Sequence, residues 1–431
     1  MTETPHLVDR QECLSYRKSD GQIRLSYLLV IGCLAGLLAG AAYADSPLSG
    51  LGYGLPGESA GARAAGMGLT SAAVADSIGL SLLNPAGWSG GPESHFGFHG
   101  VYTGSKVTDA AGSQGSDAAG FGGAALAFPL GRDLVAGMAI SPLTRMDYRW
   151  KKAQSTDWTT TLTSEEGRGG LSQALIALAL PVGGDTRLGV GARVAIGTIN
   201  RSWTASFPDI RSDSIRGSTL EGQTRFSGVG WQISWLGKAL GDLDWGAVAS
   251  GPVRMQVRQQ RKVTAGATVQ SDSTKTLSEK FDLPSSLTLG AARRMNRHLV
   301  AVEAAWSGWG SANAPPAVGG DFADAWSLGA GWEYTPESRA LDPIYRSFSY
   351  RAGAYLRDGY TLSLTGHQPR KLALTAGLSV PYAGNRSRFD LAVELGWMGS
   401  QSRDLASERT FGITLGWNHT EPWFVSRRAR R

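Results

Sequence analysis

The sequence predicts an all-β fold: a transmembrane β-barrel of about 14 antiparallel strands with an N-terminal plug, or hatch, in its lumen. Three observations favour this fold. The chain has 431 residues with 58 Gly and 14 Trp, and only 18% of its residues are charged. From residue 94 onward, segments of about ten residues alternate between apolar and small or polar side chains. Beyond the N-terminal region no run of about 18 apolar residues occurs, so membrane-spanning helices are not expected there.

The first 44 residues have the pattern of a secretory signal peptide. Basic residues precede an apolar run at residues 25–44, which ends in Ala-Tyr-Ala, so cleavage is expected after Ala44. An uncleaved anchor helix and a lipoprotein signal ending at Cys33 are the alternatives. Cys13 and Cys33 both precede the expected cleavage site, so the mature chain is expected to have no disulfide and no Cys-ligated metal.

Residues 45–90 are expected to form the hatch. Residues 61–88 are small and nearly uncharged, and they are too few to fold alone. Within them, Asn84, Pro85, Ala86 and Gly87 predict a turn, because a residue before proline is driven out of the helical region. The preceding residues 52–57 spell G-x-G-x-x-G, but no strand precedes them, so we expect a flexible periplasmic lead-in and no nucleotide site.

Residues 91–417 are expected to form the barrel. Alternation is clearest in the last third of the chain, where strands are expected at residues 299–307, 326–334, 348–357, 372–380, 389–397 and 410–417. Less regular strands are expected near residues 94–103, 120–128, 133–150, 169–180, 186–207, 224–236, 245–262 and 283–293. A soluble β-sandwich would carry many charges on one face and a propeller would show a fixed period, and the sequence has neither.

Short and long connections alternate along the predicted barrel. Long outer loops are expected at residues 104–119, 151–168, 208–223, 308–325 and 358–371. Residues 335–347 break this rule. Short periplasmic turns and long outer loops are typical of an integral outer-membrane barrel of a Gram-negative-type bacterium. Both termini would then be periplasmic, with residues 418–431 as a basic periplasmic tail.

Several charged residues fall on the small-residue face of their strands, which is the face expected to line the lumen. The candidates are Arg193, Glu303, Glu333, Arg351, Asp390 and Glu394, together with Arg357. Two explanations stay open. These residues can solvate the lumen and neutralise one another, or they can form a polar cradle for the hatch or for a carboxylate head group. Gly-rich inner faces, such as those around Gly189 and Gly228, leave room for a plug.

The residues at 61–75, the Asn84-Pro85-Ala86 turn and the run LPSSLTLGA at residues 283–291 together resemble the FadL/TodX family of outer-membrane channels. The resemblance implies passive uptake of hydrophobic small molecules, such as long-chain fatty acids or aromatic hydrocarbons. It also implies a lateral exit into the membrane where Pro142 interrupts the third strand. Residues 410–417 resemble the terminal-strand signal that the barrel assembly machinery reads.

The chain continues past the aromatic residue that usually ends such barrels. This tail resembles that of a related branch of FadL-like barrels, which includes PorV-like subunits. The resemblance implies an alternative function, a plugged barrel that docks secretion proteins. We expect no enzyme activity, cofactor, metal site or nucleic-acid partner. His95 and His99 are about 13 Å apart along a strand, and Ser59 lacks the strand and acid that a nucleophile elbow needs. The expected partners are outer-membrane lipids and lipopolysaccharide, the barrel assembly machinery and a hydrophobic ligand.

Overall fold

The structure is a computed structural model of the whole chain. It describes residues 46–57, 60–88, 93–131, 133–156, 159–208, 217–239, 242–265, 268–313, 319–337, 343–363, 365–382, 386–404 and 406–422. Contacts divide the chain into two units, Met1–Ala42 and Tyr43–Arg431, and every described residue belongs to the second. The expected signal peptide, both cysteines, Ser59 and residues 423–431 lie outside the described residues.

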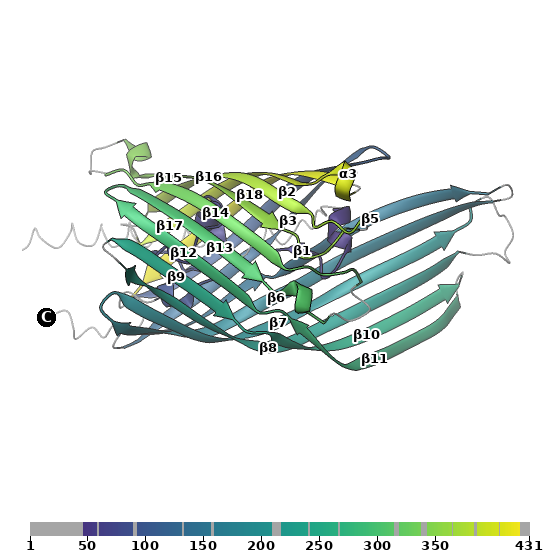
Figure 1. Cartoon of the computed structure of the whole chain (residues 1–431), viewed down its shortest axis with the longest axis horizontal. Coiled ribbons are helices and arrows are strands. Elements are labelled where there is room, and N and C mark those ends of the chain that lie inside the picture. The colour runs from purple at the N-terminus through teal and green to yellow at the C-terminus, as the bar shows by residue number, and fades with distance from the viewer. Residues whose placement is uncertain are drawn as a thin grey trace, which may run out of the picture. The chain divides into compact units, whose positions relative to one another are not determined.

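The second unit contains a closed antiparallel barrel of 14 strands, which confirms the predicted fold class (Figure 1). Three wall strands are each divided into two pieces: β4 (Leu134–Pro142) with β5 (Thr144–Ser155), β9 (Leu243–Ser250) with β10 (Val253–Ala265), and β11 (Thr268–Leu283) with β12 (Ser286–Met295). The undivided strands are β2 (Ser94–Asp109), β3 (Ser113–Gly131), β6 (Thr160–Gly183), β7 (Thr186–Ser206), β8 (Ser218–Ala239), β13 (His298–Ser307), β14 (Ala325–Tyr334), β15 (Ser349–Asp358), β16 (Arg370–Tyr382), β17 (Ser387–Gly399) and β18 (Ala406–Glu421). The barrel closes where β18 pairs with β2 along the whole of both strands.

The described helices are short. They are α2 (Gly61–Ala65), α3 (Gln401–Asp404), and the 3-10 helices η1 (Pro47–Gly50), η2 (Pro85–Trp88), η3 (Trp309–Ser311) and η4 (Ile344–Ser347). None of them is long and apolar enough to span a membrane.

Alternation along the strands separates a lipid-facing surface from a lumen-facing one. On β13, Val302 is 52% exposed while its neighbour Ala301 is 2% exposed. The same contrast recurs around the wall, where exposed large apolar side chains include Ile176, Val190, Val229, Trp231, Leu289, Leu328, Leu374, Leu395 and Leu415. An outward apolar band on a closed barrel defines an integral membrane protein of the outer-membrane type.

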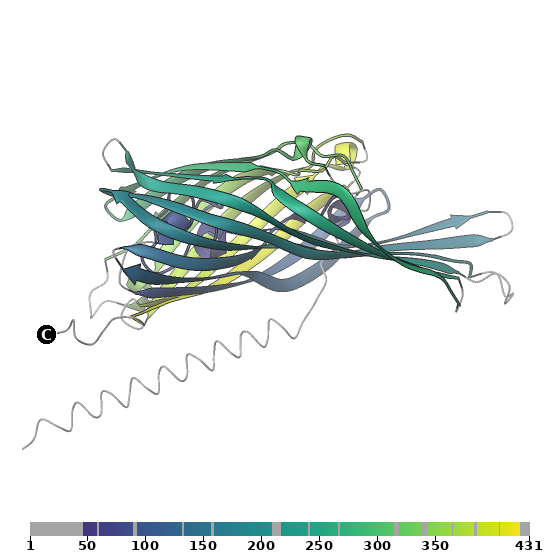
Figure 2. The same cartoon turned by 90° about the horizontal axis from the view of Figure 1, so that it is seen from below.

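Six strands continue well beyond the rest of the wall. They are β5, β6, β7, β8, β10 and β11, and Figures 1 and 2 show them projecting as one bent sheet. We call this end of the barrel the extended end, and the end where β2 begins and β18 finishes the turn end. The prediction of loops at residues 104–119 and 151–168 is wrong, because strands cover most of both ranges. The loop predicted at residues 208–223 is shorter than expected, because β8 already begins at Ser218. Water reaches both faces of the projecting sheet, so its strands lack the apolar alternation that marks a spanning strand.

The described residues between positions 46 and 88, which we call the N-terminal segment, run through the barrel interior. The two-residue strand β1 (Leu55–Pro56) pairs with β5. Ser46 lies at the extended end, where its N–H donates to Asp147 O at 2.9 Å and its hydroxyl to Glu408. The expected flexible periplasmic lead-in at residues 52–57 is wrong, since Tyr53 is only 1% exposed within an apolar cluster. Aromatic burial holds this stretch in place, although its glycines and proline suggest a loose turn.

Candidate functional site

The N-terminal segment is joined to the wall by ion pairs. The Nη2 of Arg63 lies 2.7 Å from Glu333 Oε1 of β14, and its Nη1 lies 3.1 Å from Asp76 Oδ2. The Nη2 of Arg388 on β17 lies 2.5 Å from the same Asp76 oxygen. Burial alone would raise the pKa of Asp76, but the guanidinium groups of Arg388 and Arg63 hold that pKa well below its usual value.

The wall continues this network. Arg351 on β15 bridges two carboxylates, with Nε 2.7 Å from Glu333 Oε2 and Nη1 2.9 Å from Asp390 Oδ1. Arg388 Nε lies 2.9 Å from Asp390 Oδ2. The six members of this ion network are Arg63, Asp76, Glu333, Arg351, Arg388 and Asp390. Three cations and three anions make the ion network neutral in sum, which satisfies the requirement that buried charges be paired.

Backbone groups of the segment are also bound by wall side chains. Glu303 Oε2 on β13 accepts hydrogen bonds from the N–H groups of Ser71 and Ala72, both at 2.7 Å. The hydroxyl of Thr375 accepts one from the Gly68 N–H at 3.0 Å. These contacts give the irregular backbone of the segment the partners that a helix or sheet would otherwise supply.

The predicted turn at Asn84 is an anchored element. The amide nitrogen of Asn84 donates to Ala72 O at 2.6 Å and to Trp235 O of β8 at 3.2 Å, and its Oδ1 accepts from the Ala86 N–H at 3.0 Å. Pro85, Ala86 and Gly87 form the 3-10 helix η2 with Trp88, which is buried against β3, β4 and β6. Asn84 therefore ties two parts of the segment to each other and to the wall.

Glycines of the wall allow the segment to approach the wall backbone. A methyl group on Gly246 would lie 1.9 Å from Ala72 O, and one on Gly331 would lie 2.3 Å from Met67 O. Similar close approaches occur at Gly189, Gly290, Gly329, Gly353, Gly377 and Gly416. Gly228, also predicted to leave room for a plug, instead lies against Arg254 and Met255 of β10. The small-residue face of the wall thus matches the course of the segment.

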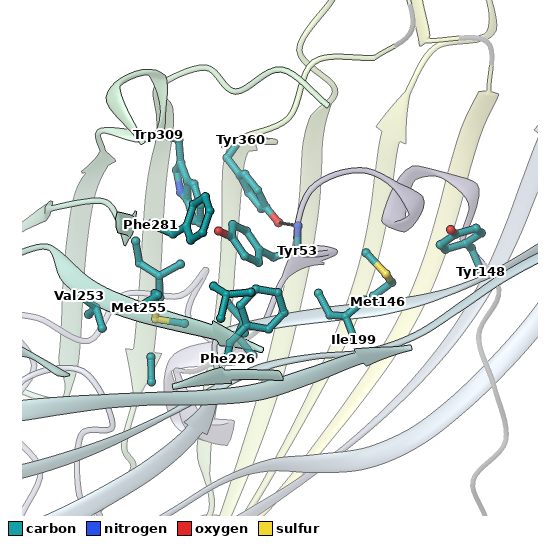
Figure 3. Packing of buried hydrophobic residues seen from close by; sticks show 14 residues of the cluster. Tyr53, Met146, Tyr148, Ile199, Phe226, Val253, Met255, Phe281, Trp309 and Tyr360 are labelled. Atoms are coloured by element: carbon teal, nitrogen blue, oxygen red, sulfur yellow. Dashed lines mark hydrogen bonds between the residues drawn. The ribbon is translucent and has the colours of Figure 1, made fainter. Parts of the chain in front are cut away.

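Aromatic side chains hold the beginning of the segment near the extended end (Figure 3). The Tyr53 ring lies 5.5 Å from Phe226 of β8 and 5.9 Å from Trp309. The Tyr360 hydroxyl accepts a hydrogen bond from the Tyr53 N–H at 3.0 Å and donates one to Gly54 O, while its ring stacks on Trp309 at 4.1 Å. Burial raises the pKa of Tyr53, so its hydroxyl stays protonated.

Two cavities flank residues 54–57 of the segment. The first, of about 150 Å³, lies against β2, β16 and β18. It is lined by the apolar residues Leu48, Leu55 and Met398 and by charged residues, namely Arg145, Asp147, Arg357, Asp358, Lys371 and Glu408. The second, of about 290 Å³, lies against β12, β13 and β14. Pro56 and Gly57 line both cavities, so the segment forms the partition between them.

Strand pairing in the wall is interrupted at the division between β4 and β5. β3 pairs with β4, while β5 pairs with β6 and β1, and no pairing joins β3 to β5 among the described residues. Phe121, Pro142 and Arg145 line both the first cavity and a concavity of about 820 Å³ on the lipid-facing side. Pro142 therefore lies between the first cavity and this concavity.

The structure places the predicted lumen residues in two groups. Glu303, Glu333, Arg351 and Asp390 hold the segment directly or through the ion network. Arg193 instead donates to Gln173, and Glu394 pairs with Lys371 and accepts from the Tyr355 hydroxyl. Sequence reasoning missed Arg63, Asp76 and Arg388, although Arg63 and Asp76 are the only charged residues between positions 61 and 88. Two charged residues within a run of small, uncharged residues could have indicated that these side chains bind partners in the wall.

The two strand histidines also face the segment. His99 Nδ1 accepts from the Ala62 N–H at 3.3 Å, and His95 Nδ1 lies 3.2 Å from Ile78 O. Within the described ranges no group of three or more His, Cys, Asp or Glu residues is arranged to hold a metal.

The closed 14-stranded wall, the segment in its lumen and the divided third strand define a FadL/TodX-like outer-membrane barrel. Three solved structures share this fold. A FadL homologue of Pseudomonas aeruginosa is 12% identical, with a TM-score of 0.61 and coverage of 85% of this chain and 99% of that one. The toluene transporter TodX of P. putida is 16% identical, with a TM-score of 0.57 and coverage of 84% and 99%. The monoaromatic hydrocarbon channel CymD is 12% identical, with a TM-score of 0.56 and coverage of 84% and 97%.

The chain belongs to the BamG family, whose model matches residues 23–429. No curated protein matches this chain.

Proposed function

We propose that this protein is an outer-membrane channel through which hydrophobic small molecules pass passively, with the N-terminal segment acting as its hatch. The main support is the set of residues common to the lumen cavity and the lipid-facing concavity, namely Phe121, Pro142 and Arg145. A molecule that moves between the two spaces crosses the wall sideways. It then never meets the turn end, where the segment is anchored by Asn84 and Trp88.

The size of the lumen cavity favours small ligands. An apolar cavity of about 150 Å³ binds benzene. This cavity has that volume, and its lining combines apolar side chains such as Leu55 and Met398 with charged ones such as Arg145 and Lys371. The structural neighbours CymD and TodX are named for monoaromatic hydrocarbons and toluene. For this chain we propose aromatic hydrocarbons before long-chain fatty acids, because an extended acyl chain needs more room than the cavity offers.

The decisive experiment is uptake of labelled toluene and labelled palmitate by cells with and without this protein. Arg145→Ala widens the side opening and is expected to raise uptake, while Arg145→Trp fills it and is expected to lower uptake. Arg293→Ala, at an exposed position near the turn end, is the matched control. Equal uptake by all variants and by cells lacking the protein would refute transport through this opening.

A second candidate is a docking role in which the barrel carries other proteins. The family name, BamG, contains the abbreviation Bam, which is used for the barrel assembly machinery. The projecting sheet also has a polar surface and two edge strands, β5 and β11, with which another protein can pair. A row across one of its faces holds Trp150, Glu165, Trp203 and Leu220. Under this proposal, subunits of the barrel assembly machinery co-purify with the wild-type protein and not with Trp150→Ser/Trp203→Ser, while hydrocarbon uptake is unchanged. Loss of uptake without loss of partners would favour the channel.

A further inference from the structure

A row of cationic and hydroxyl side chains crosses four strands on the outer surface of the barrel. Thr198 of β7 lies opposite Arg225 of β8, Arg225 lies opposite Arg258 of β10, and Arg258 lies opposite Thr276 of β11. Residues directly opposite each other in a sheet point to the same face. All four line the concavity of about 820 Å³ on the lipid-facing side.

The two arginines of this row have like charges that no acidic side chain in the described part of the chain balances. Arg225 Nε donates to Gln223 Oε1 at 2.9 Å, and neither guanidinium has a carboxylate within ion-pair distance among the described residues. Like charges directly opposite each other destabilise a sheet. An anion between them would remove this repulsion and accept their remaining N–H groups.

The depth of the row points to the kind of anion. Towards the turn end the outward face becomes apolar on β7 and, beyond Ser227, on β8, with Ile196 52% and Val229 61% exposed. On β10 the outward face stays polar through Gln256 and Arg254. Towards the extended end the outward positions are polar, as at Asn200, Gln223 and Gln260. On β7 and β8 the row thus stands at the border between the apolar band and the aqueous sheet, which is the level of lipid head groups.

We propose that the concavity binds a phosphorylated lipid of the outer leaflet, with a head-group phosphate on Arg225 and Arg258. Arginine is suited to this because its planar guanidinium binds phosphate through two parallel hydrogen bonds. The hydroxyls of Thr198 and Thr276 flank the phosphate, and the acyl chains lie over Ile196 and Val229. The row lies outside the lumen, and the test measures lipid retention, which does not require transport.

The test uses the full-length barrel in nanodiscs of phosphatidylethanolamine that contain either bisphosphorylated lipid A or its dephosphorylated form. Native mass spectrometry counts the lipid A retained per barrel. We expect the bisphosphorylated form to be retained about tenfold more than the dephosphorylated form, a difference that needs about 1.4 kcal/mol. Equal retention of both forms by the wild-type protein would overturn the proposal without any variant.

Variants then locate the site. Arg225→Gln/Arg258→Gln is expected to lose most of the retained lipid A. Arg225→Lys/Arg258→Lys is expected to keep part of it, because lysine keeps the positive charge but cannot donate two parallel hydrogen bonds to a phosphate. Arg293→Gln removes an exposed arginine elsewhere and is expected to change nothing. Retention by the double Gln variant contradicts the assignment. Full displacement of lipid A by millimolar inorganic phosphate, or capture of an acidic protein in its place, would mean that the pair serves another anion.

Discussion

Removing the positive charge of Arg63 should weaken the binding of the N-terminal segment to the barrel wall. Arg63→Met keeps most of the side-chain volume but removes the ion pairs with Glu333 at 2.7 Å and with Asp76 at 3.1 Å. The ion network then carries one uncompensated negative charge. We expect the segment to leave its docked position more often and the barrel to conduct small ions.

The size of the effect depends on the ion pairs that Glu333 and Asp76 still make after the substitution. Breaking a buried ion pair by removing one partner costs about 3–5 kcal/mol. Glu333 still has Arg351 and Asp76 still has Arg388, so the lower limit applies. About 3 kcal/mol against docking corresponds to a roughly 100-fold rise in the undocked fraction.

Conductance across a planar bilayer measures that fraction. The barrel lacking residues 62–88 sets the fully open level. Arg149→Met is the control, because its partner Glu166 is 36% exposed and such pairs contribute about 1 kcal/mol or less. Arg63→Met/Glu333→Met removes one charge of each sign and should recover part of the closed state. The reasoning is refuted if Arg63→Met conducts no more than Arg149→Met.

Three further predictions concern the same contacts. Gly246→Val places a side chain against the Ala72 carbonyl and should lower the free energy of unfolding by about 1–3 kcal/mol, whereas Gly104→Ala, with its nearest neighbour 3.9 Å away, should leave the thermal midpoint within error. Tyr360→Phe leaves the Tyr53 N–H without its acceptor and should cost about 1–3 kcal/mol, with the exposed Tyr345→Phe as the silent comparison in thermal denaturation. Because the folded pKa of Asp76 lies below its unfolded value of about 3.9, its contribution is complete above that pH and is lost as the pH falls through the folded pKa, so conductance should stay low down to about pH 4. A rise centred above pH 5, or a silent Asp76→Asn at pH 7, would contradict that assignment.

The barrel wall was predictable because burial is one-sided in each spanning strand. Apolar side chains at every second position, such as Val300, Val302 and Ala304, identify the lipid-facing side of a strand. The predicted bounds of β13 agree with the observed bounds to within one residue. The projecting parts of β5 to β8 gave no such signal. Their register is set by neighbouring strands, as where Trp203 pairs with Glu165 and Leu220, and pairing partners far apart in the chain are invisible in a local pattern.

The lumen contacts were only half predictable. Period two identified Glu333 and Asp390 as inward-facing, but their partners Arg63 and Asp76 belong to an irregular segment with no period to read. The course of that segment is fixed by which wall glycines it meets. Gly189 was singled out in advance, whereas Gly246, which makes a closer approach, was not, because only the path of the segment distinguishes one inward glycine from another.

The close contact between the wall glycines and the segment constrains the order of assembly. The segment touches the backbone of the wall on several sides, so it has no room to thread into a finished barrel. The last seam joins β2 to β18, the first and last strands of the wall, and it forms only after the whole chain is available. Residues 46–88 precede every wall strand in the chain and must already lie inside when that seam closes. We therefore expect the segment to act as a template for closure of the barrel, and its removal to slow folding even where the finished barrel is stable.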